Sequence, residues 1–151
     1  KFAPRGDVIY LINELDSTVC SLAYDAESGA MKLLSTVSTL SKSDGAENRC
    51  SEIVVSADGG FAYAANRGED TIATIELGEG GEMRRTASTP CGGRVPRNIA
   101  LDPSEQYLFC TNQESGGLTW FRRDSRDGSL SQFGSISIGT PMCAVALKLS
   151  G

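Results

Sequence analysis

The apolar residues of this chain fall in short runs that alternate with turns rich in glycine, proline and aspartate. Two such runs, residues 53–55 and 61–65, are separated by the turn residues 57–60 and followed by the polar tip Asn66-Arg67-Gly68. Runs of this length with turn residues between them predict a β-hairpin. No window of 11 or more residues has apolar positions at helical spacing. We therefore expect an all-β protein.

The hairpin recurs along the chain. Residues 96–113 align without a gap with residues 50–67, and Asn13, Asn66 and Asn112 mark the same point in three units. The intervals between these asparagines are 53 and 46 residues. Repeats of about 40 to 50 residues with several short strands each are typical of a β-propeller, which has about four strands per blade.

We divide the chain into blade units on this basis. The units cover about residues 1–40, 50–90 and 96–139, and a closing inner strand covers 141–149. The predicted strands are 8–12, 19–24 and 31–38, then 53–55, 61–65, 71–76 and 82–88, then 99–101, 107–111, 118–122 and 130–138. Three blades and one strand cannot close a ring without leaving sheet faces uncovered. We expect the C-terminal part of a longer propeller, whose remaining N-terminal blades are its partner.

The composition and charge of the chain argue against several classes of partner and of catalytic site. The net charge of −5 disfavours nucleic acid or an anionic membrane as the main partner. No apolar run approaches the roughly 20 residues of a membrane helix, so the expected location is the cytoplasm. The chain contains no histidine, which excludes a histidine triad, zinc site or general base from its own residues. Its five cysteines form no C-x-x-C pair and are expected to be reduced and mostly buried.

One face of the predicted propeller collects the chemically varied loops. In an antiparallel blade, the loops between the second and third strands and the crossovers between blades emerge on the same side. Four arginines fall there in an otherwise acidic protein: Arg49, Arg67, Arg94 and Arg97. A cationic mouth of this kind suits a small anionic substrate. The pair Arg122-Arg123, by contrast, falls on a third strand and is predicted to lie on a blade surface.

The starts of the inner strands indicate a site near the axis. Glu52, Asn98 and Cys143 occupy equivalent positions and differ in chemistry, as residues of a site would. Two other interpretations stay open: Glu52 could pair with Arg97 or accept backbone hydrogen bonds, and Arg94 could be a solvated loop charge. Cys143 is an alternative nucleophile, although the chain offers no base suited to activate it.

Several of these segments together resemble the β-propeller lactonase family, which includes bacterial 6-phosphogluconolactonases and the fungal carboxy-muconate cyclase. The matching segments, in the order of the family, are Asn13-Glu14-Leu15, Glu52-Ile53, Asn66-Arg67-Gly68, Pro96-Arg97-Asn98, Asn112-Gln113 and Pro141-x-Cys143. The resemblance implies a ring of seven blades of which this chain is the C-terminal part. It also implies that a histidine and a further arginine of the site come from earlier segments. The family's His-Pro turn is Ala3-Pro4 here.

The resemblance implies a lactone hydrolase that uses neither a metal nor another cofactor. Glu14 and Arg67 match positions proposed to be catalytic: Glu14 would be the general base and Arg67 would stabilise the oxyanion or carboxylate, with Glu52 as the alternative base. The residues expected to bind the substrate are Arg97, Asn66, Asn98, Gln113 and Arg49.

The expected substrate is a small anionic lactone, phosphorylated or carboxylated, and the expected reaction is 6-phosphogluconolactonase-like hydrolysis in the pentose phosphate route. One alternative is a lactone-forming enzyme like the carboxy-muconate cyclase. Another is a propeller that binds a partner without catalysis. Trp120 is predicted to pack between blades, which leaves this face without an aromatic stripe for a peptide and favours the enzyme.

Overall fold

The computed structural model describes residues 1–42 and 47–147, which form three antiparallel sheets. The first sheet contains β1 (Val8–Asn13), β2 (Thr18–Tyr24) and β3 (Met31–Ser38). The second contains β4 (Arg49–Val55), β5 (Phe61–Arg67), β6 (Thr71–Leu77) and β7 (Met83–Pro90). The third contains β8 (Pro96–Leu101), β9 (Tyr107–Asn112), β10 (Gly117–Arg123) and β11 (Leu130–Ser137). One 3-10 turn, Glu79–Gly81, is the helical element of the described chain.

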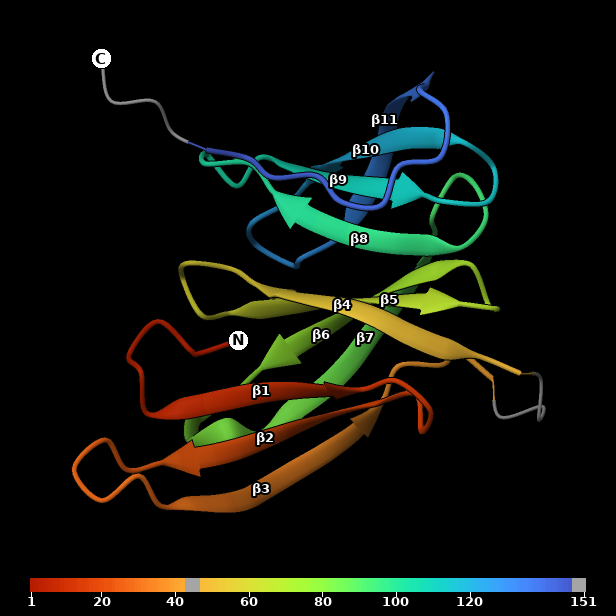
Figure 1. Cartoon of the computed structure of the whole chain (residues 1–151). Coiled ribbons are helices and arrows are strands. Elements are labelled where there is room, and N and C mark those ends of the chain that lie inside the picture. Colours follow the sequence, from red (N-terminus) through yellow and green to blue (C-terminus); the bar gives the residue numbers. More distant parts are fainter. Residues whose placement is uncertain (43–46, 148–151) are drawn as a thin grey trace.

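Each sheet is a meander in which every strand pairs with its neighbour in the sequence. Figure 1 shows the three sheets stacked face to face, with the first and third at the two ends of the stack. The predicted all-β fold is confirmed. The predicted blades of four antiparallel strands are confirmed for the second and third units. The first unit has three strands, and a single bridge between Phe2 and Ile9 stands where its inner strand would pair.

The inner strands begin earlier than predicted because each contains a bulge. In β4 the pairing jumps from Cys50 with Asn66 to Ile53 with Ala64. In β8 it jumps from Pro96 with Asn112 to Asn98 with Thr111. A bulge adds an unpaired residue and turns the side chains around it. Glu52 and Arg97 therefore lie at irregular points of their strands.

The predicted closing strand is not formed by the described residues. Residues 141–147 carry no strand, and 148–149 lie outside the described residues. The segment contacts the third sheet through Ala144, whose N–H donates to Oδ1 of Asn98 at 2.9 Å. A strand needs a hydrogen-bonded partner strand, and the described residues contain no further strands for that blade. The closing strand stays a prediction about a complete ring.

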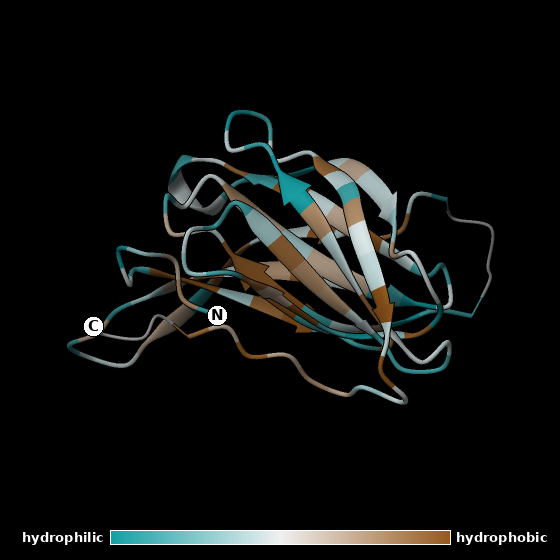
Figure 2. Ribbon diagram, turned by 90° about the horizontal axis from the view of Figure 1, so that it is seen from above, coloured by the Kyte–Doolittle hydropathy of each residue, from teal (hydrophilic) through white to brown (hydrophobic). Residues whose placement is uncertain are grey.

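Two apolar layers hold the sheets together. Ala62 and Ala64 on β5 pack toward the first sheet with Tyr10, and Tyr63 and Ala65 pack toward the third. Because side chains alternate across a strand, β5 supplies both layers and is buried along almost its whole length. Figure 2 shows most of the hydrophobic colour along the strands and most of the hydrophilic colour in the turns at their ends.

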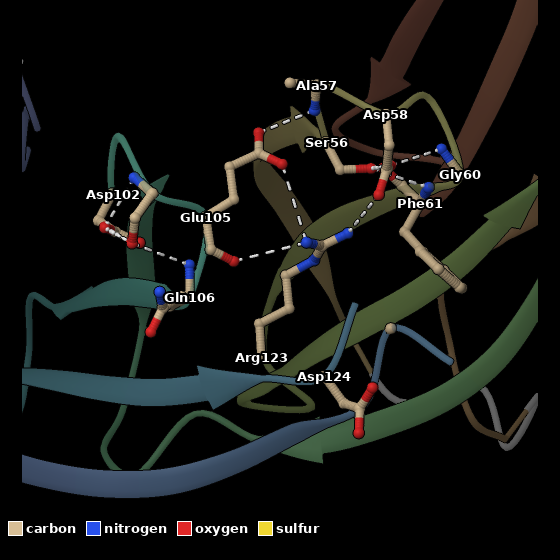
Figure 3. A network of polar contacts seen from close by, with 12 residues as sticks. Ser56, Ala57, Asp58, Gly60, Phe61, Asp102, Glu105, Gln106, Arg123 and Asp124 are labelled. Carbon is tan, nitrogen blue, oxygen red and sulfur yellow. Dashed lines mark hydrogen bonds and ion pairs between the residues drawn. The ribbon is translucent and has the colours of Figure 1, made fainter. Parts of the chain in front are cut away.

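Arg123 lies inside the second of these layers, so its predicted place on a blade surface was wrong. Its side chain is only 2% exposed, and its Nε donates to the hydroxyl of Tyr63 at 2.9 Å. Its guanidinium also forms ion pairs with Asp58 at 3.4 Å and Glu105 at 3.8 Å (Figure 3). The Cζ atom of Arg123 lies 5.8 Å from the ring centroid of Phe61. Arg123 thus joins the second and third sheets.

Candidate functional site

A hollow of about 470 Å³ opens where the inner strands begin. It is lined by Ile12, Glu14, Cys50, Ser51, Glu52, Arg67, Arg97, Asn98, Met142 and Cys143. Five of these residues are predicted site residues, contributed by all three sheets: Glu14, Glu52, Arg67, Arg97 and Asn98. The stacking of the sheets therefore brings together predicted site residues that are up to 84 positions apart, since Glu14 and Asn98 line the same hollow.

Glu14 and Arg67 form an ion pair across the first and second sheets. Glu14 directly follows β1, and Arg67 is the last residue of β5; Nη2 of Arg67 donates to Oε1 of Glu14 at 2.6 Å. The same Nη2 donates to the carbonyl oxygen of Cys50 at 3.0 Å. The Arg67 side chain is 17% exposed and that of Glu14 is 56% exposed. The guanidinium is thus held in place, whereas the carboxylate faces the solvent of the hollow.

Arg67 also has an unused donor. Its Nε is buried and has no hydrogen-bond partner among the described residues. A buried donor without a partner costs about 1 to 3 kcal/mol. Such a group in the wall of a hollow is typical of a site in which a ligand or water supplies the acceptor.

Glu52 and Asn98 form a hydrogen-bonded pair between the second and third sheets. Nδ2 of Asn98 donates to Oε2 of Glu52 at 3.0 Å, and Nζ of Lys1 lies 3.7 Å from Oε1. The alternative in which Glu52 pairs with Arg97 is not what the structure shows. None of the ion pairs among the described residues involves Arg97, which is half-buried in the wall of the hollow.

The backbone that leads to Arg97 is strained. Val95 has φ of +57°, a left-handed conformation that is unfavourable for a β-branched residue and for one that precedes proline. Two hydrogen bonds hold it: its N–H donates to Oδ1 of Asp70 at 2.8 Å, and its carbonyl accepts from the N–H of Gln113 at 3.0 Å. Conformations of this kind cost about 1 to 3 kcal/mol and cluster at functional sites.

The structure corrects the assignment of Asn66 to substrate binding. Asn66 is completely buried; its Nδ2 donates to the carbonyl of Thr39 at 3.1 Å and to Thr71 Oγ1 at 3.2 Å. Its Oδ1 accepts from Thr39 Oγ1 at 2.7 Å. Asn112 and Asn13 hold their own loops in the same way. The repetition of asparagine in all three units was the signal for a scaffold role.

Arg49 and Gln113 do not line the hollow. Arg49 is exposed and pairs with Glu47 at 3.1 Å, while Gln113 is half-buried in the β9–β10 loop. Arg94 is exposed and lies 3.8 Å from Glu114, as a solvated loop charge would. The crossover that contains Arg49 was expected to add to the mouth, but its residues 43–46 lie outside the described residues.

Neither cysteine of the hollow is hydrogen-bonded to a carboxylate or another base among the described residues. Burial raises the pKa of the Cys50 thiol. Cys143 is exposed, and its Sγ contacts the carbonyl oxygen of Ala144 at 3.8 Å, which is not a base. Cys20, Cys50, Cys91, Cys110 and Cys143 are all free thiols.

The described part of the chain contains neither a cluster of metal ligands nor a helix that could cross a membrane. Within residues 1–42 and 47–147, no group of three or more histidine, cysteine, aspartate or glutamate side chains is placed to hold a metal ion. Over the same residues, no helix has the length and apolar character needed to cross a membrane.

Comparisons with known proteins agree with this fold. Residues 1–146 match the family model described as "Lactonase, 7-bladed beta-propeller". The chain is 33% identical over 144 residues to a protein of Bacillus subtilis named 6-phosphogluconolactonase. It is 38% identical over 132 residues to one of the same name from Formosa agariphila. These matches cover 94% and 85% of the chain but only 41% and 36% of the two relatives. The chain thus spans less than half the length of these relatives.

Solved structures agree as well. A periplasmic gluconolactonase of Pseudomonas aeruginosa superimposes with a TM-score of 0.89 at 27% identity, over 95% of this chain and 40% of that one. A protein from Lactobacillus plantarum superimposes with a TM-score of 0.88 at 33% identity, and the match covers 93% of this chain and 41% of that one. The ordered motifs, the blades and these similarities lead to one conclusion: the chain belongs to the family of lactonases with a seven-bladed β-propeller fold.

Proposed function

We propose that this chain supplies one side of the active site of a lactone hydrolase, within a seven-bladed ring whose N-terminal blades complete the site. The observation that carries the proposal is the Glu14–Arg67 ion pair in the wall of a hollow that also holds Glu52 and Arg97. A carboxylate beside a fixed guanidinium offers a base and an oxyanion stabiliser at one point. The relatives named 6-phosphogluconolactonase and the gluconolactonase structure support this reaction class.

In the proposed reaction, Glu14 removes a proton from a water molecule, and the water oxygen bonds to the lactone carbonyl carbon. Arg67 stabilises the oxyanion that forms on the carbonyl oxygen. The bond between the carbonyl carbon and the ring oxygen then breaks, and the proton passes from Glu14 to that oxygen, which leaves a hydroxy acid. The 56% exposure of Glu14 leaves room for the water, and the Cys50 carbonyl keeps Arg67 in place. The proposed reaction needs no metal or other cofactor.

Arg97 is proposed to hold the anionic group of the substrate. It is the half-buried guanidinium of the hollow without an ion pair among the described residues, and guanidinium groups bind phosphate and carboxylate in a bidentate manner. The substrate we propose is 6-phosphogluconolactone, which would place the protein in the pentose phosphate route. The cytoplasmic location stays a prediction, since one similar structure is a periplasmic enzyme.

The test is Glu14→Gln in the complete ring. Loss of one transition-state contact typically lowers kcat by about 10²- to 10³-fold, and we expect this loss for 6-phosphogluconolactone hydrolysis with an unchanged circular dichroism spectrum and melting temperature. Glu114→Gln is the matched control, because Glu114 is an exposed glutamate in a loop of the same face. It should keep the wild-type rate.

Three outcomes would contradict the proposal. An undiminished rate in Glu14→Gln would remove Glu14 from the mechanism and leave Glu52 as the base to test. Formation of a lactone from a carboxylated muconate, without hydrolysis of 6-phosphogluconolactone, would favour the cyclising enzyme. Tight binding of sugar acids without turnover of either lactone would favour a binding propeller.

A further inference from the structure

A row of polar contacts crosses the inner strands from blade to blade. Nζ of Lys1 lies 3.7 Å from Glu52, Asn98 donates to Glu52 at 3.0 Å, and the N–H of Ala144 donates to Asn98 at 2.9 Å. The row thus connects the first segment of the chain, the second sheet, the third sheet and the C-terminal segment. Glu52 and Asn98 form its centre.

This central pair divides two hollows. The first is the candidate site of about 470 Å³, and the second has about 560 Å³ and continues along the inner strands. Glu52, Asn98 and Cys143 line both of them. The second hollow is lined largely by apolar and small residues, which include Val54, Ile99, Leu101 and Ala146. The Glu52–Asn98 pair therefore lies where the two hollows meet, and we call this pair the floor of the candidate site.

The charges of the first hollow differ between its wall and its floor. Arg67 is neutralised by Glu14, which leaves Arg97 as the wall guanidinium without an ion pair among the described residues. The floor holds the carboxylate of Glu52, whose nearest cation is the half-exposed Lys1 at 3.7 Å. An anionic group is therefore favoured near Arg97 and disfavoured near Glu52. A substrate with one charged end has one preferred orientation.

The floor has unused hydrogen-bonding capacity. Each carboxylate oxygen of Glu52 accepts one bond within the protein: Oε2 from Asn98, and Oε1 from the N–H of Ile53 at 3.2 Å. Asn98 Nδ2 uses one of its two hydrogens for Glu52, and Oδ1 uses one of its two lone pairs for Ala144. The pair thus offers acceptors and a donor side by side. A hydroxyl group both donates and accepts, so two neighbouring hydroxyls match this set.

We propose that Glu52 and Asn98 determine substrate specificity by binding neighbouring ring hydroxyls of a polyhydroxylated lactone whose single anionic group lies at Arg97. This inference rests on the proposed lactone hydrolysis and adds to it the two residues that recognise the ring hydroxyls of the substrate. An unsaturated dicarboxylate fits poorly, because it has no hydroxyls for the floor and would place a second carboxylate beside Glu52. Sites that hydrogen-bond a substrate hydroxyl reject analogues without it by about 10⁴- to 10⁵-fold when the polar groups are left unpaired.

The experiment compares 6-phosphogluconolactone with a phosphorylated lactone of the same ring size that lacks the ring hydroxyls, both assayed with the complete ring. The wild type is expected to prefer the hydroxylated lactone by at least about 10³-fold in kcat/KM, because the partly exposed Glu52–Asn98 pair gives less than the full discrimination of a buried one. Glu52→Gln and Asn98→Ala should each lower kcat/KM for the hydroxylated lactone by about 10- to 100-fold. Their effect on the analogue should stay below about 3-fold, so the preference shrinks.

The controls separate the inference from the proposed function. Glu114→Gln should keep the wild-type preference, since it lies outside both hollows. An equal loss on both lactones in Glu52→Gln and in Asn98→Ala would overturn the inference, because a base or a scaffold residue acts on every substrate alike. A wild-type enzyme that hydrolyses both lactones equally well would also overturn it, with the proposed function intact. A protein that hydrolyses neither lactone would overturn both. If Glu52→Gln fails to fold, Asn98→Ala carries the same comparison.

Discussion

At the scale of single residues, the largest departure from the sequence prediction is Arg123. The guanidinium is buried between the second and third sheets, where it forms ion pairs with Asp58 and Glu105 (Figure 3) and donates a hydrogen bond to the Tyr63 hydroxyl. Desolvation alone would lower its pKa, but its contacts with Tyr63 and Asp58 raise it overall. It therefore stays charged, and its cost of burial is offset by several hydrogen bonds.

Removal of this side chain should destabilise the protein markedly. Arg123→Ala leaves the Tyr63 hydroxyl and the carboxylates of Asp58 and Glu105 without their cation, and we expect a loss of about 2 kcal/mol in the free energy of unfolding. That figure is below the 3 to 5 kcal/mol typical of a broken buried pair, because half of the Asp58 side chain is exposed. Urea denaturation measures it. The neighbour Arg122 is exposed, so Arg122→Ala should change stability by less than about 0.5 kcal/mol. Equal effects of the two substitutions would contradict the structural role of Arg123.

The same network makes the free energy of unfolding depend on pH. Burial pushes the pKa of Asp58 upward, but hydrogen bonds from Ser56 and Gly60 and the charge of Arg123 outweigh this effect, so the pKa is lowered. A carboxyl group with a lowered pKa binds fewer protons when folded than when unfolded. Its stabilisation is fully present above the unfolded pKa of about 3.9 and is lost as the pH falls through the lower folded value.

We therefore expect the midpoint of urea denaturation to fall as the pH decreases below about 4. Asp58→Asn should have a lower midpoint at neutral pH and a shallower decline in acid, because part of the linked protonation is gone. The measurement is a series of urea titrations between about pH 2.5 and 7. An identical decline in Asp58→Asn and in the wild type would rule out this carboxyl group as a source of the acid sensitivity.

At the scale of the elements, two hairpin turns share one conformation and differ in their surroundings. Gly29 closes the β2–β3 turn and Gly128 closes the β10–β11 turn, each at φ of +72° with its N–H bonded to the carbonyl four residues earlier. A Cβ added at Gly29 would meet open space, whereas one at Gly128 would lie 2.4 Å from a ring carbon of Phe61. The second turn is thus pressed against the neighbouring blade.

This pair of turns gives a matched prediction. Gly29→Ala should cost about 1 kcal/mol, from the left-handed backbone alone. Gly128→Ala should cost about 1 to 3 kcal/mol more, because the added methyl group forces Phe61 to move within a packed layer. Denaturant titrations of both variants measure the difference. Equal losses would show that the turn moves away from Phe61 freely.

The elements also show how far the sequence predicts the site. The strands and the turns between them follow from alternating apolar residues and from glycine, proline and aspartate, and most predicted strands lie where the structure has them. The bulges at the starts of β4 and β8 were not predictable, because a bulge depends on the pairing between two strands and not on one strand. These bulges decide how Glu52 and Arg97 face the hollow.

At the scale of the whole molecule, both ends of the stack present apolar sheet faces. On the third sheet, Tyr107 and Phe133 form an edge-to-face pair with ring centroids 5.6 Å apart, and Phe133 is 61% exposed. On the first sheet, Leu11 and Leu33 are also exposed. Blades of a ring bury these same faces between the second sheet and its neighbours, so we expect the missing blades of the ring to cover them.

Phe133 tests that expectation. In the complete ring, Phe133→Ala should lower the free energy of unfolding by about 3 kcal/mol, the cost of truncating a buried phenylalanine. Its exposed neighbour Gln132 serves as the control, and Gln132→Ala should change stability by less than about 0.5 kcal/mol. Guanidinium titrations provide both values. A change in Phe133→Ala as small as that in the control would mean that no blade packs on this face.

By itself, the sequence determined most of the strands, the repeat and the face that carries Glu14, Arg67 and Arg97. These features depend on local patterns: side chains alternate along a strand, and a few residue types make turns. Only the tertiary structure decided which polar side chains reach the hollow. Asn66 and Arg67 are adjacent in sequence, yet one is buried in the scaffold and the other lines the site. The reason is physical: blades pack on both faces of β5 and bury it up to Asn66, whereas Arg67 is the last residue of that strand and lies where the strand end meets the hollow.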